Sequence, residues 1–575
     1  MKPDYKHLKS NLKKDFTGFP IRRLAVLGDS PTQLLAIALK GYGYESRVNY
    51  DIFEADFNQI EMQALHPASS LYQFNPDVVV VFFSSESLFS SYCNLEPDSK
   101  SGLAQNFIEK IYNITDTITE HSNATVIVVN FCTINDGIFG NYANKTQSSF
   151  LFQLRKLNYE LMLAATVRPK LFIADFDLLQ SAYGFDARRK ESVYINTGII
   201  TDIDFTPHLA SSIHDTINAM SGKFRKCVIL DLDNTLWGGI IGDDGIVNIQ
   251  IGNLGIGKAY YQLQQWLKEL SRRGIILAVC SKNDETIAKS VFTDHPEMVL
   301  RLKDISVFMA NWDNKADNIR QIQAVLNIGF DSMVFLDDNP FERNLVAKEL
   351  PAVLVPGLPE DPAQWLPFLQ RMNLFETVSY DKLDAERTSK YQEEAKRVTS
   401  KSKFTDEDDY LKSLQMEAEI MPFTSFSIPR MAQLSQRSNQ YNLTTIRYDV
   451  QDLVKITENP DYDTLSVSLK DIYGDYGLVS MVVLKKQSGT LRIESWLMSC
   501  RVMSRGVEKI VMNEIVRLAA SRKLDVITGE YIPTEKNHLV ADHYKKLGFS
   551  GSDQQWEMRT AQFKELKTFI SQKDA

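Results

Sequence analysis

Short apolar runs alternate with helical patterns over most of the first 350 residues, and many of the runs end in small, polar or acidic side chains. Strands that alternate with helices form βαβ units, which build parallel sheets covered on both faces. The pattern occurs twice, with a break at the Gly-containing stretch 221–224. The sequence therefore predicts two consecutive α/β domains.

The first series predicts strands at residues 23–28, 77–83, 125–131 and 170–175. The second series predicts strands at residues 226–231, 275–281, 305–309 and 333–338. Helices are expected between the second set of strands at residues 257–272, 284–292, 314–326 and 341–349.

Beyond the second series the pattern changes twice. Residues 371–417 are highly charged and predict a solvated helical linker. Residues 463–499 alternate around a turn and predict antiparallel strands, followed by amphipathic helices at 505–521 and 535–547. The predicted fold class is multidomain α/β with a C-terminal α+β domain, divided into residues 1–220, 221–370, 371–417 and 418–575.

Composition excludes two classes of partner. The formal charge of −9 lacks the basic face of a nucleic-acid-binding protein. The longest apolar run, residues 78–83, is too short to cross a membrane. The five cysteines are scattered without metal or redox spacing, and the N-terminus lacks the apolar core of a signal peptide, so we expect a cytoplasmic protein.

Two carboxylates stand where the first strand of the second series ends. Asp231 closes the apolar run, and Asp233 lies two positions beyond it. Ligand-binding groups gather at the carboxyl ends of parallel strands. Two like charges so close would repel, and a bound cation removes that repulsion. Mg²⁺ prefers oxygen ligands and often binds through one or two carboxylates plus a phosphate.

Three further polar groups follow in order, each at a strand end or a helix start. They are Ser281, Lys315 and the pair Asp337 and Asp338. A hydroxyl, an ammonium and two carboxylate pairs suit phosphoryl transfer through an aspartyl-phosphate, since a carboxylate is already an ionised nucleophile at pH 7.

The motif D-x-D-x-T, followed by Ser, Lys and Asp-Asp, resembles the haloacid dehalogenase (HAD) superfamily of aspartate-nucleophile phosphatases. The strings "DLDNTLWGGIIGDDG", "SKND" and "VFLDDNPFERN" are similar to its FkbH-like subgroup. The resemblance is dense over residues 226–356 and looser in the C-terminal domain. It implies a HAD Rossmann-like domain, and the short separation of Asp233 from Ser281 leaves no room for a large cap.

The resemblance assigns a role to each of these groups. Asp231 would be the nucleophile and a Mg²⁺ ligand, and Asp233 the general acid and base, its carbonyl also binding the metal. Ser281 and Lys315 would hold the phosphoryl group of a phosphorylated small-molecule or carrier-bound substrate. Asp337 would bind the metal directly, and Asp338 would support the metal or Lys315. The alternative is a degenerate HAD scaffold that only binds.

The N-terminal domain resembles SGNH hydrolases around Gly28-Asp29-Ser30, at a strand-to-helix turn. The resemblance implies that Ser30 is the nucleophile, with Asp204 and His208 as its partners. The family pattern is Asp-x-x-His, whereas "DFTPH" has one residue more. We therefore expect a degenerate SGNH/flavodoxin-like domain, in which Ser30 is either a hydrolase nucleophile or the cap of the following helix.

The C-terminal domain resembles GNAT acyltransferases at "RVMSRG", residues 501–506, with Ser504 in place of the first glycine and Gly506 in place of the last. Such loops bind the pyrophosphate of coenzyme A. The resemblance also implies that Asn537 and Tyr544 orient the cofactor and protonate the thiolate. Coenzyme A or a phosphopantetheine group is the implied cofactor.

The FkbH-like resemblance adds an alternative function. In that family a phosphoglyceryl donor is dephosphorylated and its acyl group is loaded onto an acyl carrier protein. Cys500 would then hold the acyl group, with Arg501 lowering its pKa, or be a small core residue. The leading hypothesis is a Mg²⁺-dependent HAD phosphatase fused to a GNAT-like domain. A third hypothesis is an assembly scaffold whose terminal domains only bind partners.

Overall fold

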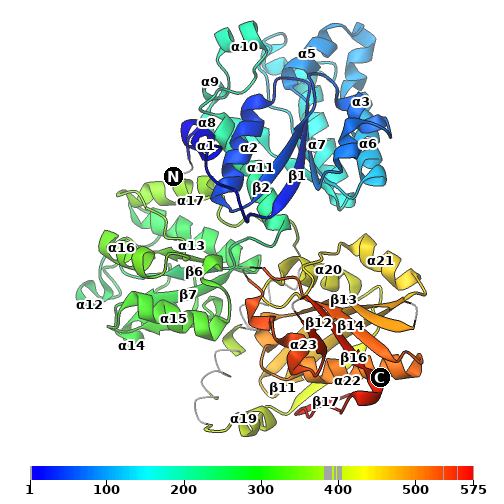
Figure 1. Ribbon diagram of the computed structural model, residues 1–575. Helices are drawn as coiled ribbons and strands as arrows, with labels where there is room; N and C mark the ends of the chain where they lie inside the picture. The colour runs from blue at the N-terminus through cyan, green and yellow to red at the C-terminus, as the bar shows by residue number, and fades with distance from the viewer. Residues whose placement is uncertain are drawn as a thin grey trace. The chain divides into compact units, whose positions relative to one another are not determined.

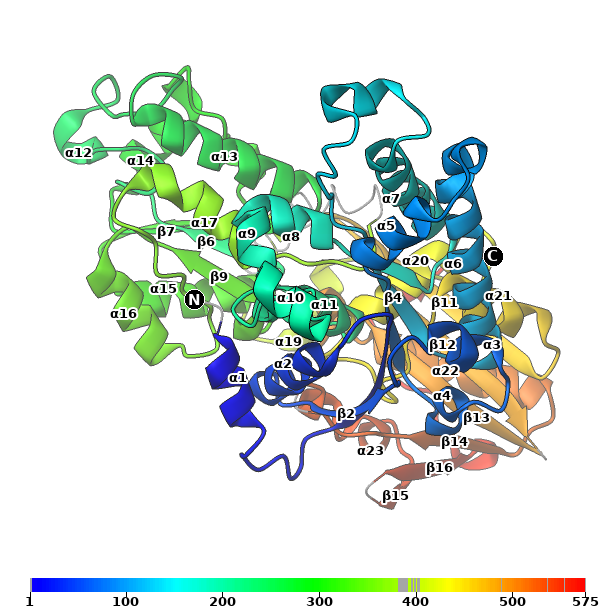
Figure 2. The ribbon, with the colours of Figure 1, turned by 90° about the horizontal axis from the view of Figure 1, so that it is seen from above.

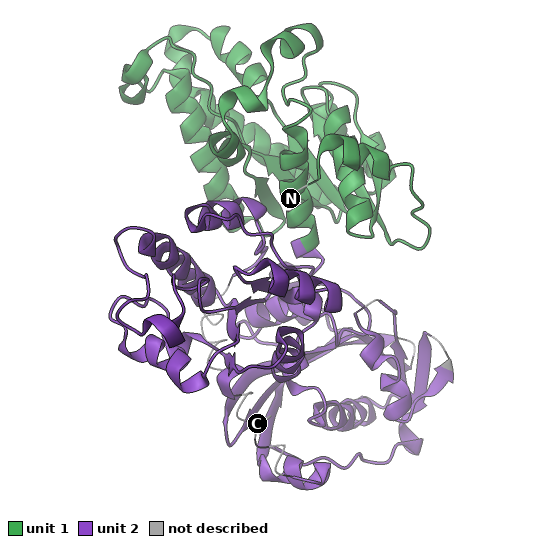
Figure 3. Cartoon of the chain, turned by 90° about the vertical axis from the view of Figure 1, so that its left-hand side faces the viewer, with its two compact units in different colours: residues 1–218 green, residues 219–575 purple. Residues whose placement is uncertain are grey.

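The computed structural model describes residues 3–380, 391–393, 397, 400, 404–487, 489–534, 536–552 and 554–573. The chain divides into two compact units, residues 1–218 and residues 219–575 (Figure 3). The middle of the charged segment 371–417 that was predicted as a helical linker, residues 381–390 and most of 394–403, lies outside the described residues. No helix in the described part of the chain is long and apolar enough to cross a membrane.

Unit 1 contains a five-stranded, all-parallel sheet in the order β2-β1-β3-β4-β5. Its strands are β1 (Ile21–Gly28), β2 (Asn49–Glu54), β3 (Val78–Phe82), β4 (Thr125–Val129) and β5 (Leu171–Ala174). This is the flavodoxin-like doubly wound order, in which the chain reverses direction across the sheet between β1 and β3. Four of the strands were predicted, whereas β2 was not.

Helices cover both faces of this sheet (Figures 1 and 2). One face packs against α3 (Ile60–Leu65), α5 (Ser85–Cys93), α6 (Leu103–His121) and α7 (Phe150–Val167). The other face is covered by α2 (Gln33–Glu45) and α11 (Thr206–Met220). The remaining helices are α1 (Tyr5–Asn11), α4 (Ser70–Phe74), α8 (Phe176–Tyr183), α9 (Phe185–Arg188) and α10 (Glu191–Thr197).

Unit 2 begins with a four-stranded parallel sheet in the order β8-β7-β6-β9. The strands are β6 (Cys227–Leu230), β7 (Ile276–Ser281), β8 (Val307–Ala310) and β9 (Met333–Leu336). The helices are α12 (Ile241–Asp244), α13 (Gly257–Arg272), α14 (Glu285–Asp294), α15 (Lys315–Leu326), α16 (Pro340–Glu349) and α17 (Trp365–Met372). The predicted strands and helices of this region are found within a few residues of their expected positions.

Alternate side chains of the central strand face the two helical layers. Val228 and Leu230 pack against α13, α14 and α17, whereas Cys227 and Ile229 pack against α15 and α16. Both faces are buried, as the continuous apolar runs of these strands require. Between β6 and α13 the chain forms a short flap that contains α12 and a bridge between Gly238 and Gln250, and no large cap is inserted there.

The rest of unit 2 is an eight-stranded mixed sheet in the order β15-β16-β14-β13-β12-β11-β10-β17. Its strands are β10 (Met416–Met421), β11 (Tyr462–Asp471), β12 (Gly474–Gln487), β13 (Thr490–Met498), β14 (Val526–Glu530), β15 (Ser550–Ser552), β16 (Gln555–Arg559) and β17 (Ile570–Gln572). The helices are α19 (Glu407–Ser413), α20 (Ile428–Arg437), α21 (Val450–Glu458), α22 (Val507–Ser521) and α23 (His543–Lys546).

The core of this sheet has two sides: α19 and α22 pack on one face, and α20 and α21 on the other. The predicted fold class, two parallel α/β regions followed by an α+β region, is confirmed. The prediction of an amphipathic helix at residues 535–547 is wrong. The described residues of this stretch form a 3₁₀ turn at His538–Val540 and the short α23.

Candidate active site

The carboxyl edge of the β6–β9 pair brings the two predicted aspartate pairs together. Leu230 pairs with Leu336 in the parallel register, and each strand is followed at once by an aspartate. Parallel neighbours with ends in register must present Asp231 and Asp337 side by side. Carboxylate oxygens of Asp231, Asp337 and Asp338 lie within 4.8 Å of one another.

Lys315 joins this group from a separate element. It is the first residue of α15, whose N-cap Asn314 accepts a hydrogen bond from the backbone N–H of Ala316. Its Nζ lies 2.9 Å from Oδ1 of Asp231 and 2.6 Å from Oδ2 of Asp337. Only 4% of Lys315, 5% of Asp231 and none of Asp337 is exposed. The ion pairs are therefore almost fully removed from water.

Burial and mutual repulsion shift the pKa values of this group. Burial, aided by the Asp231 charge, raises the pKa of Asp337 to about 7 even though Lys315 opposes the shift. Burial raises the pKa of Asp338 for the same reasons. Burial lowers the pKa of Lys315, but Asp231 and Asp337 outweigh it, and the net shift is upward. The group thus holds more negative charge than its one ammonium balances.

Thr235 connects the two aspartate pairs and was not among the predicted site residues. Its hydroxyl lies 3.4 Å from Oδ2 of Asp231 and 3.4 Å from Oδ1 of Asp338, and it accepts a hydrogen bond from the N–H of Asp338. The sequence carried a signal for it, since it is the threonine of D-x-D-x-T. Its contacts fix the spacing between the two strand ends.

The side chain of Asp233 is hydrogen-bonded to the flap and to the loop after β7. Its Oδ1 accepts hydrogen bonds from Trp237 Nε1 and from the N–H of Ile241, both at 3.0 Å. Its Oδ2 accepts one from Asn283 Nδ2 at 2.9 Å. Burial raises the pKa of Asp233, although the hydrogen bonds from the flap oppose the shift. Asn283, in the "SKND" string, is a second contact that the sequence analysis did not single out.

Ser281 is the last residue of β7 and is 1% exposed. Because β7 is the other parallel neighbour of β6, Ser281 lies at the same edge as Asp231. Its carbonyl accepts a hydrogen bond from Asn311, in the loop that leads to α15. The structure therefore brings together Asp231, Lys315, Asp337 and Asp338, with Asp233 and Ser281 at the same edge.

The donor set of this edge fits Mg²⁺. It consists of three carboxylates and no nitrogen or sulfur ligand in the described part of the chain, and a hard divalent cation prefers oxygen. A divalent cation would also offset the Asp231 charge, which adds to the effect of burial in raising the pKa of Asp337. Asp231, Asp337 and Asp338 are the residues that would hold it.

Around Ser30 the structure contradicts one predicted alternative. The N-cap of α2 is Thr32, and Ser30 does not cap the helix. The Ser30 hydroxyl is buried and has no hydrogen-bond partner among the described residues, so it is not paired with His208. Asp204 is exposed, and the ring of His208 stacks on Tyr183 with centroids 3.9 Å apart. The three residues do not form a hydrogen-bonded triad.

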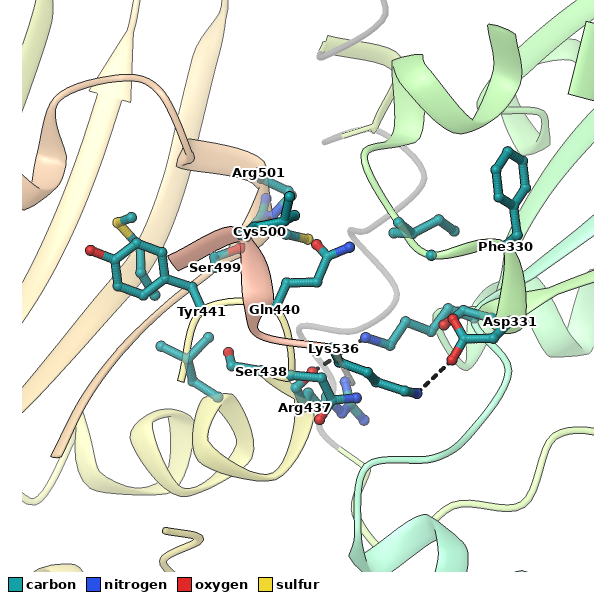
Figure 4. A pocket seen from close by; sticks show the side chains of 18 of the residues that line it. Phe330, Asp331, Arg437, Ser438, Gln440, Tyr441, Ser499, Cys500, Arg501 and Lys536 are labelled. Atoms are coloured by element: carbon teal, nitrogen blue, oxygen red, sulfur yellow. Dashed lines mark hydrogen bonds and ion pairs between the residues drawn. The ribbon is translucent and has the colours of Figure 1, made fainter. Parts of the chain in front are cut away.

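The predicted acyl-site residues fall into three groups: Cys500 and Arg501, Ser504 and Gly506, and Asn537 and Tyr544. Cys500 and Arg501 line a cavity (Figure 4), and Cys500 is partly buried and also packs against the apolar core on the α15 side of the parallel sheet. Ser504 has a left-handed φ of 63°, the conformation that glycine favours, and Gly506 caps α22 with a φ of 84°.

Asn537 and Tyr544 belong to the interior of the C-terminal domain. Tyr544 is 1% exposed, its ring packs among those of Phe549 and Trp556, and burial raises its pKa well above the ordinary value. The Asn537 amide donates to the carbonyls of Asn442 and Ile532 and accepts from the N–H of Thr534. The amide is therefore committed to holding a loop.

We expect Asn537→Ala to lower the free energy of unfolding by about 2–3 kcal/mol, because it leaves buried backbone groups unpaired. Urea unfolding followed by tryptophan fluorescence measures the change. Asn459→Ala is the matched control, since exposed Asn459 accepts only a local bond from Asp461, and it should cost less than half as much. Unchanged stability of the Asn537 variant would contradict the structural role.

Different parts of the chain match different known proteins. Residues 23–218 match the FkbH N-terminal domain family. The N-terminal part of protein BF1531 from Bacteroides fragilis, solved with a phosphatase domain complexed with Mg, is 49% identical, with a TM-score of 0.64. The match covers 66% of this chain and all of that one.

Matches to acetyltransferases are shorter and more distant. Ribosomal-protein-S18-alanine N-acetyltransferase from Escherichia coli is 9% identical over 25% of this chain and 94% of that chain, with a TM-score of 0.21. The GNAT domain of PAT from S. lividans is 15% identical over 24% and 89%, also with a TM-score of 0.21. No curated protein matches the sequence.

Proposed function

This chain belongs to the same protein family as BF1531 of Bacteroides fragilis, and from that premise we propose that it is a Mg²⁺-dependent phosphatase. Its residues 23–218 match the FkbH N-terminal domain. The observation that carries the proposal is the buried bridge of Lys315 between Asp231 and Asp337, with Asp338 beside them. The HAD-type catalytic domain is proposed to span residues 221–370, and the GNAT-like domain residues 418–575.

Asp231 is proposed to attack phosphorus. One of its carboxylate oxygens forms a bond to the phosphoryl group of a phosphate monoester, and the bond from phosphorus to the ester oxygen breaks. Asp233 donates its proton to the departing oxygen, and its raised pKa favours the protonated form that this step needs. In the second step water attacks phosphorus and gives a proton to the Asp233 carboxylate, and the bond between Asp231 and phosphorus breaks, which releases inorganic phosphate and regenerates both aspartates.

The remaining groups position the phosphoryl group and offset its charge. Lys315 and the Ser281 hydroxyl are proposed to contact its non-bridging oxygens. A bound Mg²⁺, held by Asp231, Asp337 and Asp338 and by the Asp233 carbonyl, would supply the further positive charge that brings two anions together. Asp233 must exchange its bonds to Trp237 and Ile241 for the substrate, so movement of the flap is part of the cycle.

A screen of phosphorylated metabolites with intact protein tests the proposal and identifies the substrate. We expect Mg²⁺-dependent release of phosphate that stops when EDTA is added and returns with excess Mg²⁺. Asp231→Asn protein in the same screen separates turnover at this site from contamination. Equal phosphate release with and without EDTA would contradict the proposed metal dependence.

Acyl transfer is the second candidate function, and the position of Cys500 on a cavity wall favours it. In this proposal the donor is a phosphoglyceryl acyl phosphate. The Cys500 thiolate bonds to its acyl carbon as the bond to phosphate breaks, so the donor is dephosphorylated there, and the acyl group then passes from this thioester to the thiol of an acyl carrier protein, which frees the Cys500 thiolate. Mass spectrometry of a phosphopantetheinyl carrier protein after incubation with the donor tests it. We expect the mass of the carrier protein to increase by the acyl group, and the increase to be lost when Cys500 is replaced. If no increase is seen, acyl transfer is contradicted and phosphate hydrolysis remains as the proposed activity.

We also propose a cytoplasmic location, since all five cysteines are free thiols, as a reducing compartment favours. An SGNH-like origin of the N-terminal domain remains a proposal. Failure of a fluorophosphonate probe to label Ser30 would show that this domain is not a serine hydrolase.

A further inference from the structure

An ion pair joins two segments that flank the aspartate site. Lys282 comes directly after Ser281, the last residue of β7, and its Nζ lies 2.7 Å from Oε1 of Glu342. Glu342 stands in the first turn of α16, the helix that follows β9. Because β7 and β9 are the two neighbours of β6 in the sheet, this contact spans the end of β6, where Asp231 lies.

The carboxylate of this pair belongs to the site and not to the outer surface. Glu342 is buried. Burial raises the pKa of the Cys280 thiol, and the charges of Asp231 and Glu342 both add to that shift, so the two carboxylates lie near the same end of β7. Arg343, the next residue, donates a hydrogen bond to the carbonyl of Asp337 at 2.8 Å. The beginning of α16 is therefore held against a strand end that carries an aspartate.

The ammonium of this pair is held in place but keeps donors for a ligand. The Lys282 side chain is 38% exposed, whereas that of Glu342 is only 7% exposed. An ammonium has three N–H donors, and Glu342 is the acceptor that Lys282 has among the described residues. Two donors therefore remain for an acceptor that enters from solvent. Because a buried partner already fixes the position of Nζ, binding such an acceptor costs little further ordering.

Lys282 and Lys315 suit different parts of a substrate. Lys315 is almost fully buried between two carboxylates and is proposed to hold the phosphoryl group. Lys282 is partly exposed and follows Ser281, whose hydroxyl is proposed to contact the same phosphoryl group. The rest of a molecule whose phosphate is bound at Ser281 is thus within reach of Lys282. The pair with Glu342 shows that a carboxylate is a suitable partner for this ammonium.

We propose that Lys282 is a specificity residue, which binds a carboxylate of the substrate while the phosphoryl group lies at Asp231, and that Glu342 is its positioning residue. The inference rests on the proposed phosphatase function and narrows the substrates to phosphate monoesters that also carry a carboxylate. Lys282 then contributes to the selection of the substrate, whereas Ser281 and Lys315 act on every phosphate monoester alike.

Pairs of aryl phosphates test the proposal with full-length protein and Mg²⁺. The 3- and 4-carboxyphenyl phosphates carry the second charge at two distances from phosphorus, and the 3- and 4-carbamoyl compounds have nearly the same shape without that charge. An aromatic spacer is suitable because the exposed ring of Phe341 precedes Glu342 in α16. We expect kcat/KM for at least one carboxy compound to exceed that of its carbamoyl partner about tenfold, the effect of one hydrogen bond between charged groups.

Two variants should shift this kcat/KM ratio in opposite directions. Lys282→Gln should bring it to about one, and the new amide can still donate to Glu342, which keeps a partner. Glu342→Gln should raise the ratio about threefold, because the amide oxygen still accepts from Lys282 but no longer offsets its charge. Lys289→Gln, which alters an exposed pair with Glu285 on α14, is the matched control and should leave the ratio unchanged.

Equilibrium dialysis with Asp231→Asn protein distinguishes failure of this proposal from failure of the phosphatase function. The variant binds these compounds without turnover, and its Kd values should favour the same carboxy compound and lose that preference with Lys282→Gln. A preference in Kd without any turnover by the parent protein would contradict the phosphatase and still support Lys282. Equal values for both members of each pair, or an equal loss for both in Lys282→Gln, would show that the ion pair has only a structural role.

Discussion

Asp231→Asn is expected to lower kcat/KM for p-nitrophenyl phosphate by at least about 10⁴-fold in the presence of Mg²⁺, because an amide oxygen is too weak a nucleophile to form the phosphoenzyme. The variant should still fold. Lys315 keeps its contact with Asp337, and removal of the Asp231 charge relieves one cause of the raised pKa of Asp337. Steady-state kinetics with a circular-dichroism melt of the same sample measures both effects.

Asp317→Asn is the matched control for this loss. Asp317 lies two residues after Lys315 on α15, is exposed, and pairs with Arg320 on the surface. The substitution makes the same chemical change outside the site, and kcat/KM should stay within about twofold, since exposed pairs contribute little. Comparable activity of parent and Asp231→Asn protein would remove Asp231 from the role of nucleophile.

The aspartate site could be predicted from the sequence because it depends on topology. The strands that carry Asp231 and Asp337 are short apolar runs, and parallel strands must bring their carboxyl ends to one edge. The helix starts were also marked in the sequence: Asp284 and Asn314 cap α14 and α15 with their side chains. One of these caps places Lys315 at the beginning of its helix.

The strand that was not predicted, β2, and the helix that was wrongly predicted at residues 535–547 have different physical explanations. Strand β2 is an edge strand with mostly half-buried residues, so its apolar pattern is weak. At residues 535–547 the amphipathic pattern predicted a helix, but the Asn537 side chain bonds to backbone groups of a loop instead. Side-chain bonds of this kind compete with helix formation, and a sequence pattern does not show which of the two prevails.

The cavity beside Cys500 could not be predicted for a third reason. Asp331, Arg437 and Lys536 come from segments about 100 residues apart in the chain, and only the packing of the two sheets in unit 2 brings them together. None of these side chains stands in a recognisable motif. Of its lining, the sequence pointed to Cys500 and Arg501, and their surroundings became known from the structure.

Lys315→Met is expected to destabilise the metal-free protein by about 3–5 kcal/mol, the cost of leaving buried carboxylates without their cation. The raised pKa of Lys315 keeps the ammonium charged below its folded-state pKa, so its contribution is lost only at strongly alkaline pH. Methionine keeps most of the volume, and the loss therefore reports charge and not a cavity. Activity should fall as well, since Lys315 is proposed to contact the phosphoryl group.

Melting with and without Mg²⁺ separates this electrostatic effect from general damage to the fold. In EDTA the midpoint of the Mg²⁺-sensitive transition should fall by about 6–20 °C, and saturating Mg²⁺ should restore much of it because the cation takes over the charge of the ammonium. Lys289→Met breaks an exposed pair with Glu285 on α14 and a contact of the ammonium with the Phe308 ring, both outside the site, and should leave that midpoint nearly unchanged. If Lys315→Met melts as the parent protein does in EDTA, Asp231 and Asp337 are not ionised together, and the surplus negative charge that favours Mg²⁺ at this edge does not exist.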